Sequence, residues 1–367
     1  PSKNRGSRPR FSRENDTQQP IQIASKEGLD MPDAQDHLRG DGTLPIIAIN
    51  ADNLAEAAHK AIIACYDQGA RIETPKQKPG MSLGYDADMI VRVADPDSDP
   101  RIDFGAIVED GRGVMQYILE VTHGIHNHWK KSPEEPHFWG YTYNERFVDQ
   151  LPFIFQRIKA DWDEKAGQWG DGKGRPSGRD YQFLIWRAGE DIILEQDDPP
   201  CWQRGQIRLL KNQDGDLVLN YITDWRSRDL AKAWNENNVA QVELMKLFRA
   251  KISDVLGVEV KLGAYIDRAS SLHLYGLYFD RDGLEQSIQR MRDTPYEQMS
   301  MALEDYYSLP DGDDAESLKR LIAAQTDAEA KGHGKNASKH TLIGLGYDLA
   351  NFPYPDEWNT WPKSWDE

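Results

Sequence analysis

Apolar side chains along the middle of the chain are spaced as helices and strands require. Four segments carry them three or four positions apart, which is typical of a buried helix face. These predicted helices cover residues 54–68, 112–130, 145–163 and 230–255. The first should begin after Asp52 as its N-cap and end at Gly69. Pro152 falls inside the third, where it either bends the helix or lies in its first turns.

Shorter runs of β-branched and aromatic residues predict strands between these helices. They cover residues 89–93, 181–186, 205–210, 217–223, 258–266 and 272–279. The sequence NQDGD at 212–216 separates two of them and is typical of a hairpin turn. We therefore expect an α+β fold, in which a single domain packs a mixed or antiparallel sheet against helices.

The two ends of the chain differ from this middle region. Residues 1–45 begin with basic side chains and contain few apolar ones, which predicts a disordered basic and polar tail. Residues 283–367 predict a partly helical extension, with helices near 283–293 and 315–330. The expected folded domain therefore covers residues 46–282, with an extension at each end.

Composition and charge exclude several classes of protein. Hydrophobic residues make up 39% of the chain and charged residues 29%, which argues against collagen and wholesale disorder. No run of apolar residues is long enough to cross a bilayer, and no apolar leader opens the sequence, so we expect neither a membrane nor a secreted protein. The formal net charge of −17 argues against a nucleic-acid partner, except for a weak contact through the basic tail.

The chain has two cysteines, Cys65 and Cys201. Two cysteines make no disulfide framework and fit a reducing, cytoplasmic location. Cys65 lies on the apolar face of the first predicted helix, so we expect it in the core. Cys201 follows two prolines in DDPPC (197–201), and a stiff turn of this kind could aim a reactive thiolate. A buried, inert thiol fits the same pattern equally well.

Two polar clusters follow Cys201 in the sequence. Arg226 and Ser227 supply the donors that clamp a phosphate, and Asn237 can both donate to and accept from the amide edge of a pyrimidine. Ordinary polar groups at a helix start would look the same. His273 and Tyr275 alternate on a predicted strand, so both side chains lie on one side and could hold a sugar hydroxyl. Taken by itself, His273 fits a structural histidine better.

Three histidines raise the question of a metal site. They are His123, His126 and His128 in the sequence HGIHNHW. No cysteine or carboxylate completes a ligand set at suitable spacing, so no metal is expected.

Taken together, these motifs resemble the thymidylate synthase family, which includes the deoxypyrimidine-monophosphate hydroxymethylases. The resemblance lies in the order and spacing of DPPC, of Arg-Ser-x-Asp with an Asn eight residues later, and of His-x-Tyr, and it covers about residues 55–280. It is closest to the archaeal-type members, and the segments that carry it are GARIETPKQKPG (69–80), GIHNHWKK (124–131), YTYNERF (141–147), DDPPCWQ (197–203) and LGVEV (256–260). The second of these segments contains histidines that have no metal role in the family.

The resemblance implies a fold, a reaction and a set of catalytic residues. A thymidylate-synthase-like domain would methylate dUMP to dTMP with 5,10-methylenetetrahydrofolate, through a covalent adduct of Cys201 at C6 of the base. Tyr143, or alternatively Tyr141, matches the tyrosine near the site of proton abstraction. Glu109 is the expected general acid, with Glu120 as the alternative.

The resemblance also implies binding residues. Arg226 and Ser227 would hold the phosphate, Asn237 the N3/O4 edge of uracil, and His273 with Tyr275 the 3′-hydroxyl.

For the folate, the matching residues are Asp229, beside the pterin, and Trp129. Family members are homodimers that share arginines across the interface. The matching segment here is PSGRD (176–180), which leaves Arg179, with Arg175 nearby.

Departures from the family pattern leave a second activity open. An arginine often found near position 84 is replaced by Gly84, and no apolar C-terminal tail that would close over the folate is recognisable. Without that closure, water could quench the intermediate in place of hydride, as in a dUMP or dCMP 5-hydroxymethylase. A non-catalytic nucleotide- or RNA-binding protein is a third interpretation, which the net charge and the complete set of motifs disfavour.

Overall fold

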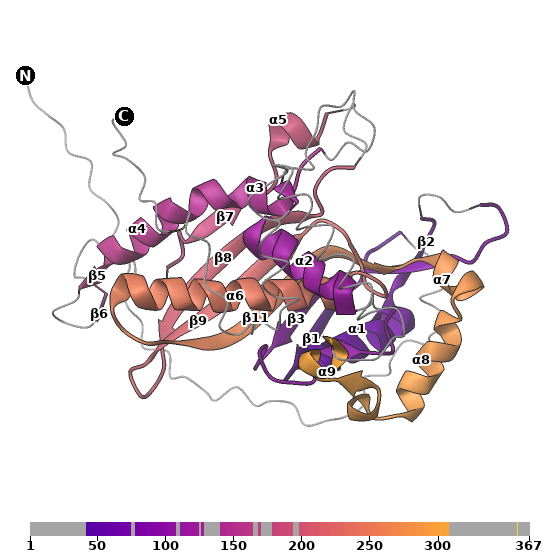
Figure 1. Cartoon of the computed structure of the whole chain (residues 1–367). Helices are drawn as coiled ribbons and strands as arrows, with labels where there is room; N and C mark the ends of the chain where they lie inside the picture. Colours follow the sequence, from indigo (N-terminus) through magenta and orange to yellow (C-terminus); the bar gives the residue numbers. More distant parts are fainter. Residues whose placement is uncertain are drawn as a thin grey trace, which may run out of the picture.

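The fold is built on one eight-stranded mixed sheet in a computed structural model of the chain (Figure 1). The structure describes residues 42–74, 78–107, 111–124, 126–127, 140–163, 168–169, 178–193, 198–307 and 358. Six strands follow one another in the order β1-β3-β11-β9-β8-β7, while β2 pairs with β3 and β10 with β11. Their bounds are β1 Ile46–Ala51, β2 Ala70–Ile72, β3 Gly84–Val93, β7 Gln182–Leu184, β8 Trp202–Lys211, β9 Leu217–Trp225, β10 Arg228–Asp229 and β11 Val260–Leu274.

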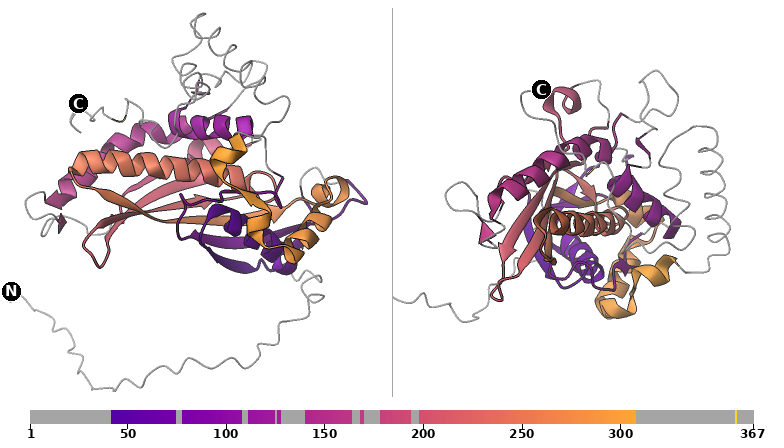
Figure 2. Two further views of the ribbon diagram at one scale, coloured as in Figure 1. Left: turned by 60° about the horizontal axis from the view of Figure 1, so that its bottom comes forward. Right: turned by 60° about the vertical axis from the view of Figure 1, so that its left-hand side comes forward.

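Helices cover one face of this sheet. The long helix α6 (Trp234–Leu256) lies along it, with α2 (Gly111–His123) and α4 (Leu151–Asp161) nearby, and α1 (Leu54–Gln68) packs on β1 and β3 (Figures 1 and 2). Because side chains alternate along a strand, Leu217, Leu219 and Tyr221 of β9 are buried beneath these helices. The predicted mixed sheet packed with helices is confirmed.

The shorter elements complete the described chain. The helices among them are α3 Tyr143–Phe147, α5 Ala188–Asp191, α7 Gly276–Arg281, α8 Leu284–Asp293 and α9 Leu303–Tyr307. Two small sheets pair β4 Ile102–Asp103 with β12 Ser300–Met301, and β5 Trp162–Asp163 with β6 Gln168–Trp169. Within the described ranges, no helix combines the length and the hydrophobicity that a bilayer crossing needs.

The first helix has its predicted bounds but a different N-cap. Asn53, not Asp52, accepts the Glu56 N–H at 2.9 Å, while the backbone N–H of Asp52 donates to the Glu56 carboxylate. At the other end Gly69 donates to the Cys65 carbonyl, and a Cβ on Gly69 would lie 2.4 Å from that oxygen. Close approach of the backbone therefore explains this glycine.

Two other helices are shorter than predicted. The segment 112–130 ends its helix at His123, because Gly124 follows with a φ of +61°. The segment 145–163 is divided into α3, a 3₁₀ turn at Val148–Gln150 and α4. Pro152 lies in the first turn of α4, where its missing N–H costs nothing.

The strand predictions hold except at their C-terminal end. NQDGD forms the predicted turn between the antiparallel strands β8 and β9. The two strands predicted at 258–266 and 272–279 are one strand, β11, because an irregularity between Ala269 and Leu272 bends it without ending it. Residues 276–281 form α7, so the strand prediction was wrong there.

Part of the predicted C-terminal extension packs on the core. Leu284, Ile288 and Met291 of α8 are buried, and β12 pairs with β4. Trp358 is buried against Phe155 of α4 and Phe248 of α6, with ring centroids 5.6 Å and 5.4 Å apart. The division at residue 282 stays a prediction, and the predicted helix near 315–330 and the tail before residue 42 lie outside the described residues.

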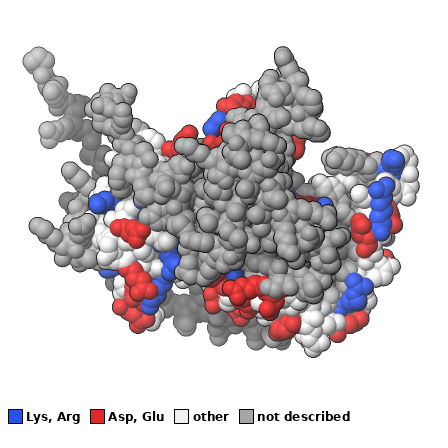
Figure 3. Space-filling view, viewed as in Figure 1, with Lys and Arg blue, Asp and Glu red and all other residues white. Residues whose placement is uncertain are grey.

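The charge of the chain is visible on its surface. On the face seen in Figure 3, acidic side chains gather along the lower edge, and Lys and Arg side chains lie scattered among acids on the described part of this face. This distribution agrees with the formal charge of −17.

His59 of α1 ties the segment after α7 to the domain. Its Nε2 lies 2.8 Å from the Met291 carbonyl oxygen, so Nε2 carries a proton and donates. Its Nδ1 lies 3.7 Å from Oδ2 of the buried Asp103. Burial lowers the pKa of His59, but Asp103, the Met291 carbonyl and Glu297 outweigh it, and the net pKa is raised.

We predict a pH-dependent stability from this contact. Because the pKa of His59 is higher in the folded state, its contribution is complete below about pH 6.5, the ordinary pKa of histidine, and is lost as the pH rises through the raised value. Asp103→Asn keeps the oxygen that accepts from Gly105 but removes the charge, and should flatten this dependence. Urea unfolding between about pH 5 and 8 measures it, with the exposed Asp52→Asn as control. Equal pH dependence in Asp103→Asn and the parent would contradict the prediction.

Candidate active site

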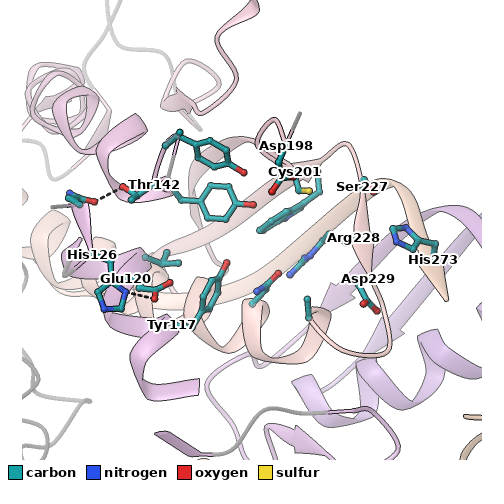
Figure 4. A pocket seen from close by; sticks show the side chains of 18 of the residues that line it. Tyr117, Glu120, His126, Thr142, Asp198, Cys201, Ser227, Arg228, Asp229 and His273 are labelled. Atoms are coloured by element: carbon teal, nitrogen blue, oxygen red, sulfur yellow. Dashed lines mark hydrogen bonds and ion pairs between the residues drawn. The ribbon is translucent and has the colours of Figure 1, made fainter. Parts of the chain in front are cut away.

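A cavity of about 800 Å³ lies where several loops meet one end of the sheet (Figure 4). Its wall contains most of the residues singled out from the sequence: Cys201, Ser227, Asp229, Asn237, His273, Tyr275 and Tyr143, together with the alternatives Tyr141 and Glu120. They come from the start of β8, from β10, α6, β11 and α2, and from the segment leading into α3. The fold therefore brings residues that are far apart in the sequence into one cavity.

Two predicted site residues that the structure describes, Arg226 and Arg179, are not part of this wall. Arg226 lines a neighbouring cavity of about 320 Å³ together with Asp224 and Arg268. Arg179 lies in the turn before β7, and its carbonyl accepts from Gln206. Glu109, Trp129 and Arg175 lie outside the described residues.

Arg226 holds the loop that carries Cys201. Its Nε and Nη2 donate to the carbonyls of Pro200 and Pro199, at 3.1 Å and 2.6 Å, and its backbone N–H donates to the Cys201 carbonyl. The two prolines provide no N–H, so their carbonyls are the groups of this turn that can be tied down. Arg226 thus positions the thiol, a role that the sequence pattern did not reveal.

Cys201 is a half-buried free thiol, whereas Cys65 is fully buried in the core as predicted. Burial raises the pKa of Cys201, and Asp198 raises it further, while Arg226 and Arg228 act in the opposite direction. The net pKa is raised, so the thiol is protonated in the resting protein at neutral pH. The two arginines therefore lower the pKa of Cys201 by less than burial and Asp198 raise it.

The tyrosines of the cavity are protonated phenols. Burial is the main cause of the raised pKa of Tyr141, Tyr143 and Tyr117. The Tyr143 ring lies edge-on to Trp202 and Trp225, with centroids 5.7 Å and 5.9 Å away. At neutral pH these side chains are therefore hydrogen-bond donors, and Tyr141 and Tyr143 lie close enough to Cys201 for its charge to affect them.

Glu120 and His126 form a carboxylate–imidazole pair in the wall. Nδ1 of His126 contacts the Glu120 carboxylate, and His126 is buried while Glu120 is partly exposed (Figure 4). His123 has a different partner, the Thr122 hydroxyl, 2.7 Å from its Nδ1. Among the described residues, no group of three or more His, Cys, Asp or Glu is arranged to hold a metal ion.

Asp229 shapes the turn into α6. Its Oδ1 accepts the backbone N–H groups of Ala231 and Lys232, and its Oδ2 accepts the hydroxyl of Tyr278. Burial raises its pKa, although these hydrogen bonds oppose the shift. The Asp229 carboxylate therefore already accepts three hydrogen bonds from the chain itself.

Arg228, which the sequence analysis did not single out, forms the base of the cavity. Its guanidinium is buried, donates to Asp267 at 2.5 Å and to Asn238 at 2.9 Å, and stacks 3.8 Å from the centre of the Trp225 ring. Asp267 also accepts from Trp234. A buried charge needs such partners, and Asp267 is 39 positions away, so no local pattern reveals the pair.

This network fixes the position of Asn237, but the Asn237 side chain makes no hydrogen bond to it. Its neighbour Asn238 accepts from both Arg228 and the Tyr265 hydroxyl. The side chain of Asn237 is nearly buried in the cavity wall and has no hydrogen-bond partner within the described part of the chain. Its amide is therefore available to read a ligand that offers both a donor and an acceptor.

Comparisons with known proteins show likeness in the solved structures alone. No family model matches the sequence, and no curated protein matches it. Among solved structures, the chain is similar to a thermostable thymidylate synthase A from Bacillus subtilis, with 16% identity and a TM-score of 0.43. The match covers 65% of this chain and 84% of the other. A TM-score this low carries no weight for the activity, so the residues of the cavity carry the proposed function.

Proposed function

We propose that the chain is an enzyme of the thymidylate synthase type, which converts dUMP to dTMP with 5,10-methylenetetrahydrofolate. One observation supports this most: a thiol, an unpartnered carboxamide and a histidine–tyrosine pair line one cavity in the combination that a pyrimidine nucleotide requires. The cavity volume lies within the range of small-molecule sites. When bound, the folate would supply a one-carbon unit and the hydride that reduces it.

Cys201 is the proposed nucleophile. Its thiol must first lose the proton that burial and Asp198 favour, and the positive charges of Arg226 and Arg228 stabilise the thiolate. The sulfur then bonds to C6 of the base, and the electron pair of the C5–C6 double bond moves toward C5 and O4. This addition makes C5 nucleophilic, which an aromatic pyrimidine otherwise is not.

The other residues would orient the base and manage protons. Asn237 donates to O4 and accepts from N3–H, and the same donor stabilises the charge that develops on O4. Tyr143 or Tyr141, kept protonated by burial, would orient the group that removes the C5 proton instead of removing it themselves. Glu120, the alternative to Glu109 as general acid, lies in the cavity wall beside His126.

We propose phosphate binding by Ser227 and Arg226, and folate contact by Asp229. Two of the donor nitrogens of Arg226 are used by the Pro199 and Pro200 carbonyls, which leaves Nη1 for a phosphate. Arg175 and Trp129 stay as proposed phosphate and folate ligands.

The proposed homodimer would cover the open face of the sheet. Ile90, Leu184 and Leu210 point away from the helices and are exposed, at 40%, 52% and 42%. Arg179 lies in the turn before the edge strand β7, where a partner subunit could receive it. Burial of these side chains by a second copy would account for an apolar face on an otherwise charged protein.

A second candidate is a 5-hydroxymethylase that acts on dUMP or dCMP. The Glu120–His126 pair favours it, because a carboxylate–imidazole pair in the cavity wall could activate a water. Trp358 of the C-terminal extension packs between α4 and α6 and is not part of the cavity wall, so this tryptophan does not shield the cavity from water.

The nucleotide product distinguishes the two candidates. With dUMP and 5,10-methylenetetrahydrofolate, we expect mass spectrometry to show a methyl group on the nucleotide, and dihydrofolate to form in step with dTMP. Cys201→Ala should abolish turnover but keep dUMP affinity within about tenfold, because the phosphate and sugar ligands remain. The matched Cys65→Ala should keep the rate. A hydroxymethyl group on the nucleotide, formed together with tetrahydrofolate, would establish the second candidate. Turnover by Cys201→Ala would show that Cys201 is not the nucleophile.

Asn237 should set the choice of base. Uracil presents N3–H and O4, a donor and an acceptor, whereas cytosine presents the reverse pattern. We expect a preference for dUMP over dCMP that Asn237→Asp narrows or reverses, because a protonated carboxyl suits cytosine. Steady-state kinetics with both nucleotides measure this, with the exposed Asn50→Asp as control. Better turnover of dCMP by the unmodified protein would overturn the assignment.

A further inference from the structure

We propose that Ser271 and Asp86 are positioning residues that hold His273 with its proton on Nδ1, so that the cavity selects a ligand hydroxyl which donates to His273 Nε2. The inference takes only the identity of the ligand from the proposed function. It concerns two residues outside the motifs described above, and it can be tested in the protein without ligand.

The irregularity in β11 brings these residues together. Along most of the pair, β11 and β3 run in steady antiparallel register, with Ala269 opposite Met89. Between Ala269 and Leu272 the register shifts, which places His273 opposite Asp86. Without the extra residue, His273 would lie opposite Tyr85. The bulge therefore aligns Asp86 with the strand position that His273 occupies.

A count of protons fixes the direction of the hydrogen bonds. The Ser271 hydroxyl donates to Oδ1 of Asp86 at 2.8 Å. The same hydroxyl oxygen lies 3.1 Å from Nδ1 of His273. A serine has one hydroxyl proton, and the carboxylate can only accept. With that proton used on Asp86, the contact to His273 requires Nδ1–H to donate.

His273 is neutral, so its second nitrogen is an acceptor. Burial lowers the pKa of His273, against the opposing effects of Asp229, Asp86 and the Ser271 backbone. A neutral imidazole carries one proton, and Nδ1 holds it. His273 is 6% exposed, lines the cavity, and has no hydrogen-bond partner at Nε2 within the described residues.

Tyr275 supplies the complementary group. Its ring meets the His273 ring at 85° with centroids 4.6 Å apart, and burial raises the pKa of its phenol, so the hydroxyl stays protonated. A ligand group that gives a proton to His273 and accepts one from Tyr275 is an alcohol. A hydrogen, a fluorine or a phosphate ester at that position cannot donate. The site would therefore require a free sugar hydroxyl.

The tautomer can be observed directly. In protein labelled with ¹⁵N-histidine, NMR of His273, assigned by loss of its signals in His273→Gln, should show a protonated Nδ1 and a bare Nε2. Ser271→Ala should remove this preference and Ser271→Thr, which keeps the hydroxyl, should restore it. Ser270→Ala, on the exposed neighbouring position, is the matched control and should change nothing. A proton on Nε2 in the unmodified protein would overturn the proposal, whatever the enzyme turns over.

Ligand discrimination supplies the second measurement. Calorimetry without folate should show dUMP binding more tightly than 2′,3′-dideoxyuridine monophosphate by about tenfold or more, the value of a hydrogen bond in a buried site. Ser271→Ala should reduce this ratio severalfold by weakening dUMP alone, while Ser271→Thr and Ser270→Ala keep it. An unchanged ratio in Ser271→Ala would contradict the positioning role. Failure of both nucleotides to bind would contradict the proposed function, and the NMR result would still decide the tautomer.

Discussion

The buried ion pair between Arg228 and Asp267 is the interaction on which the candidate site depends. Both side chains are within 1% of complete burial, where an unpaired charge is not tolerated. Asp267 of β11 accepts from Thr223 on β9 and from Trp234 on α6, so the pair joins three strands, β9, β10 and β11, to the long helix. Loss of one partner of such a pair costs about 3–5 kcal/mol, which makes this pair a strong constraint on the fold.

The positions of the reactive groups follow from this anchor. With Arg228 held inward, its neighbours Ser227 and Asp229 reach the cavity from either side of it. The parallel pairing of β10 with β11 then sets Asp229 beside His273. Asn238, which Arg228 also holds, fixes the turn of α6 from which Asn237 faces the cavity. The thiol is held separately, by the hydrogen bonds of Arg226 to the two proline carbonyls.

Local patterns predicted local structure well and long-range partners poorly. The bounds of α1 follow from its apolar spacing, but adjacent Asp52 and Asn53 are both competent caps, and only the backbone geometry decides between them. The alternation of His273 and Tyr275 placed both in one cavity, whereas the bulge that aligns Asp86 with His273 leaves no sign in the sequence. Arg226 was predicted as a phosphate ligand from its residue type, which could not reveal that two of its nitrogens hold the Cys201 loop.

The central claim is that Cys201 adds to C6 of a deoxyuridylate in this cavity. A C5 fluorine cannot leave as the C5 proton does, so 5-fluoro-dUMP with 5,10-methylenetetrahydrofolate should stop the reaction while sulfur is still bound to carbon. Mass spectrometry of the denatured protein, followed by peptide mapping, measures this directly. The account predicts a stable gain of nucleotide and folate mass on the peptide that contains Cys201, and none in Cys201→Ser. Unmodified protein under saturating ligands, or a modification on any other residue, would contradict it.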